Sequence, residues 1–331
     1  MTGDGVAGRV FVTRPLPAAW LAPLREAGLT VDVHEADDPL STAALHARVA
    51  GAAALWVQLT DRVDAALLDA AGPGLRVVAT YSVGTDHVDA AACRERGVAV
   101  VHTPDVLTDA TADLALALLL AAARRLPEGQ RLIEAGGWRG WAPTQLLGLE
   151  LRGRTLGVVG LGRIGSAVAA RARAFGMRIA YHQRHPRPET AAPLEAAFVD
   201  DLDRLLATSD VVTLHAPLTR ETRHLLDARR LALLPAHALL INTARGPLVD
   251  EGALVAALRE GRLAGAGLDV YEEEPRVHPG LLELSNVVLA PHLGSATGDT
   301  RRAMAELCSA GILTALAGGH PPNALDLPAG A

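Results

Sequence analysis

Three residues able to carry acid–base and anion-binding chemistry follow apolar runs in the second half of the chain. They are Arg245 in NTARG, Glu274 in DVYEEEP and His292 in APHLG. Reduction of a 2-oxo acid needs a cation for the carboxylate and the polarised carbonyl, a proton donor for the nascent alkoxide, and a hydride. Arg245 is the candidate cation and His292 the candidate acid, with Glu274 orienting the imidazole and favouring its charged form. A single histidine among 12 is usually a core or surface residue, so the interpretation of His292 depends on the other two residues.

A parallel sheet would bring these three residues to one edge, because open α/β sheets bind ligands at the carboxyl ends of their strands. Strand-like runs alternate with helical patterns in this half of the chain, at residues 155–159, 179–181, 211–215, 238–242, 266–269 and 287–290. The pattern predicts a doubly wound dinucleotide-binding Rossmann domain over residues 105–295.

The first part of the chain shows a similar alternation. Its strand-like runs are residues 10–13, 31–34, 54–59, 77–80 and 98–102. A long apolar helix is expected over residues 108–125, and the helical pattern over 297–317 has no strand of its own, so it should return to the first domain. The predicted fold class is therefore α/β, with two Rossmann-like domains built on parallel sheets. The first, a flavodoxin-like substrate domain, would be discontinuous and consist of residues 1–104 and 296–331.

A glycine fingerprint, GLGRIG, stands between a strand-like run and a helical one. In that context Gly160 permits a tight turn, Gly162 lets the backbone approach a pyrophosphate, and Gly165 allows close packing of helix and strand. Arg163 and Ile164 would then flank the phosphates. The alternative is an ordinary glycine-rich turn in an α/β sheet, but the placement between strand and helix favours a dinucleotide site.

The end of the next predicted strand bears on the choice of cofactor. NAD enzymes usually carry Asp or Glu there, about 20 residues on, to hold the ribose hydroxyls. Here the chain reads YHQRH, without a carboxylate. Arg184, with Arg187 as a second candidate, could pair with the 2′-phosphate of NADPH, or Arg184 could be one of many solvated arginines. The prediction is that NADPH is preferred and that NADH remains usable.

Composition excludes several classes of function. The chain has 331 residues and a net charge of -6 without a basic run, which argues against nucleic acid or an anionic membrane as partner. It contains no lysine, which excludes Schiff-base chemistry, and its only cysteines, Cys93 and Cys308, suggest neither a disulfide framework nor a metal site. Its longest apolar stretch, residues 114–123, is too short for a membrane span. A soluble cytoplasmic protein is expected.

Four of these motifs together resemble the D-isomer-specific 2-hydroxyacid dehydrogenases, and the likeness covers nearly the whole chain. They are GLGRIG, TARG, GLDVYEEEP and PHLGSAT. Four further segments are most similar to the glyoxylate/hydroxypyruvate reductases of that family: SVGTDHV, TPDVLTDATA, GGWRGW and RHPRPE. The acidic run after Tyr271 departs from one form of that reductase pattern but is common in the wider family.

The resemblance implies roles for individual residues. Arg245 would bind the substrate, Glu274 and His292 would form the acid pair, and Asp269 would lie near the nicotinamide amide. The resemblance also assigns the remaining positions by analogy: backbone N–H groups of Val83 and Gly84 for the substrate carboxylate, Thr111 and Thr243 beside the nicotinamide, and His215, Pro217 and Leu218 beside the adenosine. Read without the family, Gly84 is as well explained as a turn glycine, and Asp269 as a strand-end hydrogen-bonding residue.

The expected function is NADPH-dependent reduction of a small 2-oxo acid, glyoxylate to glycolate or hydroxypyruvate to D-glycerate. One alternative is another D-2-hydroxyacid dehydrogenase, of the 3-phosphoglycerate or D-lactate type. Another is a non-enzymatic dinucleotide-sensing protein on the same fold, because fold alone does not establish turnover. A homodimer is also expected, with the helix over 108–125 and the loop carrying Trp138 and Trp141 at the contact.

Overall fold

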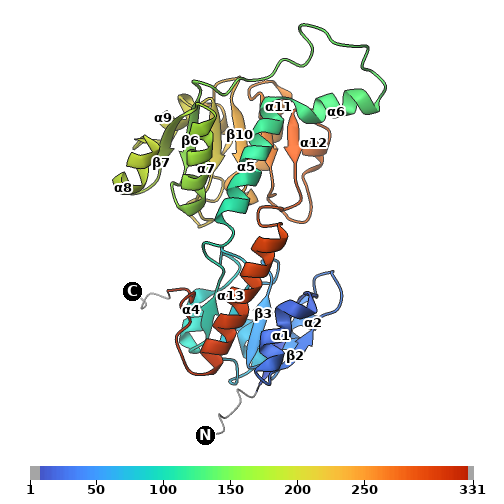
Figure 1. Ribbon diagram of the computed structural model, residues 1–331, viewed down its shortest axis with the longest axis vertical. Helices are drawn as coiled ribbons and strands as arrows, with labels where there is room; N and C mark the ends of the chain where they lie inside the picture. Colours follow the sequence, from blue (N-terminus) through green and yellow to red (C-terminus); the bar gives the residue numbers. More distant parts are fainter. Residues whose placement is uncertain (1–7, 327–331) are drawn as a thin grey trace. The chain divides into compact units, whose positions relative to one another are not determined.

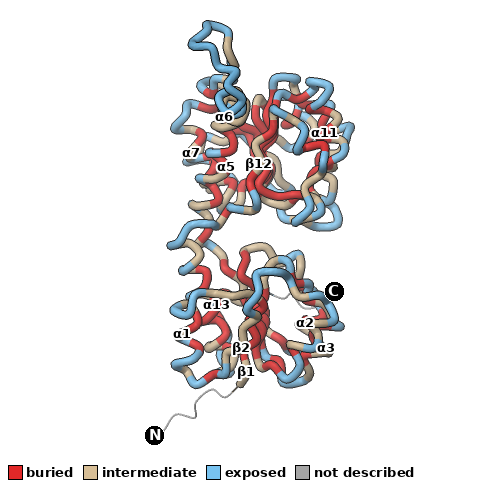
Figure 2. Tube along the Cα trace, turned by 90° about the vertical axis from the view of Figure 1, so that its right-hand side faces the viewer, coloured by how far each residue is buried: buried red, intermediate tan, exposed pale blue. Residues whose placement is uncertain are grey.

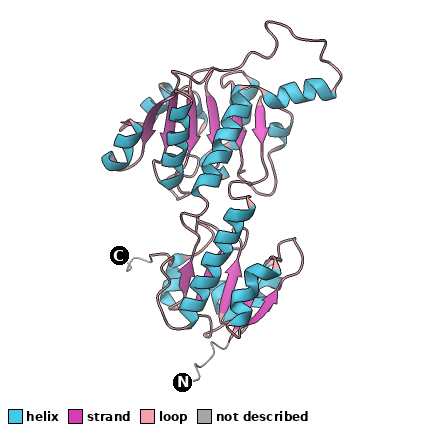
Figure 3. Cartoon of the chain, viewed as in Figure 1, coloured by secondary structure: helices cyan, strands magenta, loops and turns pink. Residues whose placement is uncertain are grey.

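The computed structural model describes residues 8–326, which form two compact units (Figure 1). The first unit takes the described residues up to Leu107 and those from Thr297 onward, and the second runs from Thr108 to Ala296. Each unit has a single parallel sheet with helices on both faces (Figure 3). The predicted fold class, including a discontinuous first unit, is confirmed.

The first unit has a five-stranded sheet in the order β2-β1-β3-β4-β5. This is the flavodoxin-like strand order. Its strands are β1 (Arg9–Val12), β2 (Thr30–Val33), β3 (Ala54–Val57), β4 (Val77–Thr80) and β5 (Ala99–Val101). Every residue of β3 and β4 is buried, as expected for central strands that are covered on both faces.

Helices cover both faces of this sheet. On one face Leu45, Leu67 and Cys93 pack against alternate strand residues, among them Leu55 and Val78. They come from α2 (Thr42–Val49), α3 (Ala65–Ala71) and α4 (Ala90–Glu95). The other helices are α1 (Ala18–Glu26) and α13 (Gly298–Leu316), which contact each other. The segment predicted to return to the first unit does so, because α13 packs on β3, β4 and β5.

The second unit has a seven-stranded sheet in the order β12-β11-β10-β9-β6-β7-β8. Its strands are β6 (Thr155–Val159), β7 (Arg178–His182), β8 (Ala197–Phe198), β9 (Val211–Leu214), β10 (Leu239–Asn242), β11 (Gly265–Leu268) and β12 (Val287–Leu289). The order reverses between β6 and β9, where doubly wound sheets bind their ligands. Strand β8 was not among the predicted runs, because two exposed residues are too few to show an alternating pattern.

Helices lie on both faces of the second sheet as well. The helices α5 (Thr108–Ala123) and α7 (Arg163–Ala174) share one apolar cluster with the strands. A second cluster includes residues of α9 (Leu202–Ala207), α10 (Ala228–Leu231), α11 (Glu251–Arg259) and α12 (Pro279–Leu282). Short helical turns complete the unit: α8 (Pro188–Ala191), Ala192–Leu194 and Gly246–Leu248.

The helix predicted over residues 108–125 ends earlier, at Ala123. Arg125 takes a left-handed conformation with φ 53°, which stops the helix, and a separate helix α6 (Leu126–Glu134) begins after it. No residue of α6 is buried, and Figure 2 shows that helix and the loop beyond it largely in the colours of exposed residues. Among the described helices, none has the length and apolar character needed to cross a membrane.

Candidate active site

The candidate acid–base and cation residues lie where three neighbouring strands end. Arg245 follows β10, Glu274 stands in the turn after β11, and His292 follows β12. Because β10, β11 and β12 are adjacent and parallel, their loops share one edge of the second sheet. The loop of Arg245 is shaped by Asn242, whose side-chain amide donates to the Arg245 carbonyl at 2.8 Å and whose side-chain oxygen accepts from Ala244 N at 3.0 Å.

His292 and Glu274 are joined by a hydrogen bond of 2.8 Å between Nδ1 and Oε2. The two side chains are half-buried, at 28% and 25% exposure. Glu274 is held from its other oxygen as well, because Oε1 accepts the Tyr271 N–H at 2.9 Å. His292 has φ 56°, and its N–H donates to the Asp269 carbonyl at 2.9 Å. With Nδ1 bound to the carboxylate, Nε2 is the ring nitrogen able to serve a substrate.

The charge state of Glu274 follows from its surroundings. Burial raises its pKa, but the hydrogen bond from His292, the charge on that ring, the Tyr271 N–H and the charge of Arg245 together outweigh burial, so the pKa of Glu274 is lowered. The carboxylate therefore stays ionised at neutral pH and can stabilise a protonated imidazole. The charge of Arg245 makes the smallest of these contributions.

Asp269 anchors the loop that carries His292. Its carboxylate oxygens accept the N–H groups of Leu293 at 2.6 Å and Gly294 at 2.8 Å, and the residue is 1% exposed. Burial raises the pKa of Asp269. Thr111, from the first turn of α5, donates its hydroxyl to the Gly294 carbonyl at 3.0 Å. Thr111, Asp269 and His292 are therefore brought together, although the contacts of Asp269 are those of a strand-end anchor.

The glycine loop after β6 turns tightly, and two of its glycines leave no room for a side chain. Gly160 has φ 96°, and a methyl group there would lie 2.9 Å from the His215 carbonyl. A methyl on Gly165 would lie 2.1 Å from the Gly160 oxygen, whereas one on Gly162 would meet nothing within 4 Å. Helix α7 starts immediately after Gly162 without a side-chain cap, which leaves its first N–H groups for an anion. Arg163 and Ile164 form the first turn of that helix.

The polar residues at the end of β7 differ in whether their side chains bond within the fold or are exposed to solvent. The ring of His182 contacts the Val199 carbonyl through Nδ1 at 2.9 Å, and Gln183 accepts the Leu161 N–H at 3.0 Å, so both are used within the fold. Arg184 is exposed. Its charge is among the causes that lower the pKa of Glu221, after a hydrogen bond from Thr219. A carboxylate near Arg184 was not foreseen from the sequence, because Glu221 comes from the loop after β9.

Residues expected beside the adenosine and nicotinamide follow β9 and β10. His215 bonds Thr213 through Nε2 at 2.9 Å, and burial lowers its pKa to about 4, so the ring is neutral at physiological pH. Pro217 is exposed and Leu218 packs on the apolar cluster behind it. The hydroxyl of Thr243 is buried and has no hydrogen-bond partner among the described residues. A buried unpaired hydroxyl is costly, which fits a position that bonds a cofactor amide.

Val83 and Gly84 lie in the first unit, in the loop after β4. Their carbonyl oxygens are used within that loop region, by His102 Nδ1 at 3.1 Å and by the Ser82 hydroxyl at 2.6 Å. Within residues 8–326, no hydrogen bond uses their N–H groups. The two groups predicted to hold a carboxylate are therefore donors at the carboxyl edge of the first sheet.

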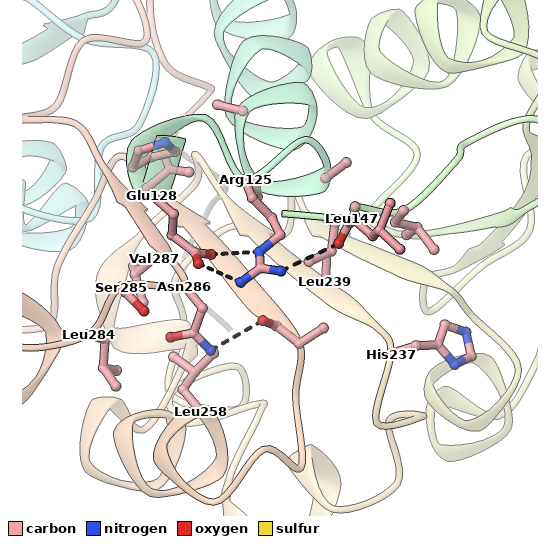
Figure 4. A pocket seen from close by; sticks show the side chains of 18 of the residues that line it. Arg125, Glu128, Leu147, His237, Leu239, Leu258, Leu284, Ser285, Asn286 and Val287 are labelled. Atoms are coloured by element: carbon pink, nitrogen blue, oxygen red, sulfur yellow. Dashed lines mark hydrogen bonds and ion pairs between the residues drawn. The ribbon is translucent and has the colours of Figure 1, made fainter. Parts of the chain in front are cut away.

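A cavity of about 640 Å³ lies at the opposite end of the same strands (Figure 4). Its walls come from the end of α5, the start of α6 and the first residues of β10 and β12. Arg125 spans it, paired with Glu128 through hydrogen bonds of 2.6 and 3.0 Å. The hollow and the predicted site are thus separated by the length of the sheet.

The family profile named D-isomer specific 2-hydroxyacid dehydrogenase, NAD binding domain, matches residues 116–294. That range covers the glycine loop and all three candidate catalytic residues. The chain belongs to the D-isomer-specific 2-hydroxyacid dehydrogenases. This 2-hydroxyacid dehydrogenase is accordingly an NAD(P)-dependent oxidoreductase with a nicotinamide-binding Rossmann unit.

Individual relatives are similar in sequence to this dehydrogenase over nearly its full length. A glyoxylate reductase of Thermococcus onnurineus is 47% identical over 319 residues, which is 95% of each chain. A solved structure of a Thermus thermophilus protein is 53% identical with a TM-score of 0.90, covering 96% of this chain and 100% of that one. An NADPH-dependent glyoxylate/hydroxypyruvate reductase of Sinorhizobium meliloti, solved with NADP and malonate, is 37% identical with a TM-score of 0.85, covering 96% and 97%.

Proposed function

We propose that this dehydrogenase reduces a small 2-oxo acid, glyoxylate to glycolate or hydroxypyruvate to D-glycerate, with NADPH as its preferred cofactor. The observation that carries the proposal is the 2.8 Å contact of His292 with an ionised Glu274, beside the charge of Arg245, at the carboxyl edge of the second sheet. Two of the relatives are a glyoxylate reductase and a glyoxylate/hydroxypyruvate reductase, which supports the same substrate class.

The residues divide the reaction between them. Arg245 binds the substrate and polarises its carbonyl group, because the guanidinium stabilises the negative charge that develops on the oxygen. When bound beside Thr111, Thr243 and Asp269, a reduced nicotinamide would supply the hydride for the carbonyl carbon. His292 gives a proton from Nε2 to the oxygen as the C–O double bond becomes a single bond, and Glu274 stabilises the imidazolium before the transfer. The N–H groups of Val83 and Gly84 are the proposed donors to the substrate carboxylate.

The cofactor would be held by the second unit. Gly160, Gly162 and Gly165, with Arg163 and Ile164, would receive the pyrophosphate. Thr111, Thr243 and Asp269 would surround the nicotinamide, and His215, Pro217 and Leu218 would border the adenosine. NADPH is favoured because β7 ends without a carboxylate and the exposed Arg184 is available to a 2′-phosphate.

A substrate panel tests the proposal. Glyoxylate, hydroxypyruvate, pyruvate, phenylpyruvate and 3-phosphohydroxypyruvate would each be assayed with NADH and with NADPH by loss of absorbance of the reduced cofactor. Highest kcat/KM with glyoxylate or hydroxypyruvate and NADPH is expected. Best turnover of 3-phosphohydroxypyruvate or pyruvate would assign the enzyme to a different branch, and cofactor binding without turnover of any acid would leave only a sensing role.

We also infer a homodimer, with the loop that carries Trp138 and Trp141, one of the two segments expected from the sequence, as the main contact. The apolar residues Leu116, Leu118 and Leu119 of α5 are buried in the core of their own unit. These residues therefore offer no surface for a partner. The exposed apolar side chains lie beyond α5, where Trp138 is 56% and Trp141 85% exposed. Sedimentation should give twice the chain mass, and a fully active wild-type monomer would overturn this inference.

A further inference from the structure

Glu272, which stands two positions before Glu274 in the acidic run, has an unusual set of partners. Its Oε1 lies 2.5 Å from His224 Nε2 and 3.1 Å from Arg223 Nη2. Its Oε2 accepts the Glu251 N–H at 3.4 Å, and its own N–H donates to Glu251 Oε1 at 2.6 Å. The side chain is only 19% exposed. A solvated surface glutamate would not engage two other segments in this way.

These contacts join the loops that follow β9, β10 and β11. A methyl group on Gly246 would lie 1.8 Å from the Tyr271 carbonyl carbon and 2.4 Å from the Glu272 nitrogen, so the loop of Arg245 rests directly on this backbone. His224 is linked to the same loop, because its N–H donates to the Pro247 carbonyl at 2.8 Å. Glu272 is therefore the side chain at which the three loops meet.

We propose that Glu272 is a positioning residue that fixes the turn carrying Glu274 against the loop of Arg245. The turn is short: the Tyr271 N–H binds Glu274 Oε1, and Glu274 Oε2 binds His292. A shift of the backbone at Glu272 therefore moves the carboxylate that orients the imidazole. The proposal rests on the proposed function, because it assigns Glu272 a part in the acid–base step without contact to the substrate.

The charges around Glu272 fit a fixed carboxylate. On one side of the Glu272 carboxylate, His224 and Arg223 both contact Oε1. On the other side Glu251 is 6% exposed, and burial, with the charge of Glu272 as a smaller cause, raises the pKa of Glu251. The neighbouring Glu273 offers a natural contrast, because its side chain is 63% exposed and pairs with Arg276 in the same turn.

The test compares Glu272→Ala and Glu272→Gln with the control Glu273→Ala. Glu272→Ala should lower kcat by about 10- to 100-fold, because misplacement of a reacting group by about 1 Å is enough for such a loss. The KM for NADPH should change by less than about threefold, because the glycine loop is untouched. Glu272→Gln keeps an oxygen to accept from His224, so it should recover most of the lost kcat. Glu273→Ala should match the wild type.

Two readouts distinguish positioning from plain stability. The descending limb of the pH profile of kcat/KM should move to lower pH in Glu272→Ala and stay in place in Glu273→Ala, because a displaced Glu274 supports the imidazolium less. Proton NMR should show a downfield Nδ1–H resonance, assigned by its loss in His292→Gln, that disappears in Glu272→Ala. The NMR readout needs no substrate.

The outcomes separate this proposal from the proposed function. A wild-type enzyme without 2-oxo acid turnover would remove the function, while the NMR comparison would still decide the positioning role. An active wild type with a folded Glu272→Ala that keeps normal kcat, pH profile and Nδ1–H resonance would overturn the positioning role alone. If Glu272→Ala fails to fold, His224→Ala removes the same contact from the other loop, and normal kcat and pH profile in that variant would contradict the proposal equally.

Discussion

The two ends of the second sheet each hold a half-buried pair formed by a basic side chain and a carboxylate. At the carboxyl edge His292 contacts Glu274 at 2.8 Å. At the amino edge Arg125 contacts Glu128 at 2.6 and 3.0 Å inside the cavity of about 640 Å³. A guanidinium cannot give up a proton in a protein, whereas an imidazole can both accept and donate one. A hollow with an ion pair is thus no sign of catalysis by itself.

The backbone adds a second difference between the ends. At the carboxyl edge the loops after β10, β11 and β12 converge, and the uncapped start of α7 faces the same edge. At the amino edge the strands only begin, and the arginine there ends one helix and precedes the next. Chemistry is therefore expected at the edge where strand ends and a helix N-terminus can meet a ligand.

The largest effect on turnover is expected from substitutions of the candidate catalytic residues at the carboxyl edge. His292→Ala and Arg245→Ala should each lower kcat by about 10²–10⁴, because proton donation and carbonyl polarisation act in the transition state. Steady-state oxidation of NADPH with the best 2-oxo acid measures the loss, with circular dichroism to show that the variants fold. Near-wild-type turnover in either variant would remove that residue from the site.

The second largest effect is expected at the end of β7, where a substitution should change the KM for NADPH. Arg184→Ala should raise the KM for NADPH about ten- to a hundredfold and leave the KM for NADH within about twofold, because only NADPH carries the 2′-phosphate. Equal loss with both cofactors in Arg184→Ala would make that residue a solvated surface arginine.

The charge of Glu274 can be tested without large changes in shape. Its pKa is lowered, so it is ionised through neutral pH and its charge is lost only as the pH falls below the ordinary carboxyl range. Glu274→Gln removes that charge at every pH, and the protonated imidazole loses its partner. In the reductive direction the limb on which activity falls with rising pH should move down by roughly one unit. A profile identical to that of the wild type would contradict the pairing.

The sequence predicted the edge of the site but not its internal geometry. Arg245, Glu274 and His292 could be placed together because each follows a strand-like run, and parallel strands end at one edge. The 2.8 Å contact between His292 and Glu274 depends on the turn from Tyr271 to Glu274 and on the left-handed backbone of His292, which no periodicity reports. The contact of His224 with Glu272 joins two irregular loops, so no periodic sequence pattern predicts it.

The dimer expectation shows a different limit of sequence patterns. The apolar pattern of a helix such as α5 predicts that the helix is buried, but it does not indicate which surface covers it. In this protein α7, β10 and β11 already cover its buried face. The end of the helix at Ala123 was also hidden, because the left-handed turn falls on Arg125 rather than on a glycine.

The smallest expected effect belongs to the amino edge and serves as the control for the others. Arg125→Ala should leave kcat/KM within about twofold of wild type, because the Arg125–Glu128 pair lies at the far ends of the strands from His292. Arg125 is 40% exposed, so loss of the pair should lower the free energy of unfolding by only about 0.5–1 kcal/mol. Urea unfolding and the standard assay measure the two quantities in one preparation. A loss of kcat comparable to that of His292→Ala, in a folded protein, would show that the cavity takes part in turnover and that the contrast between the two edges is wrong.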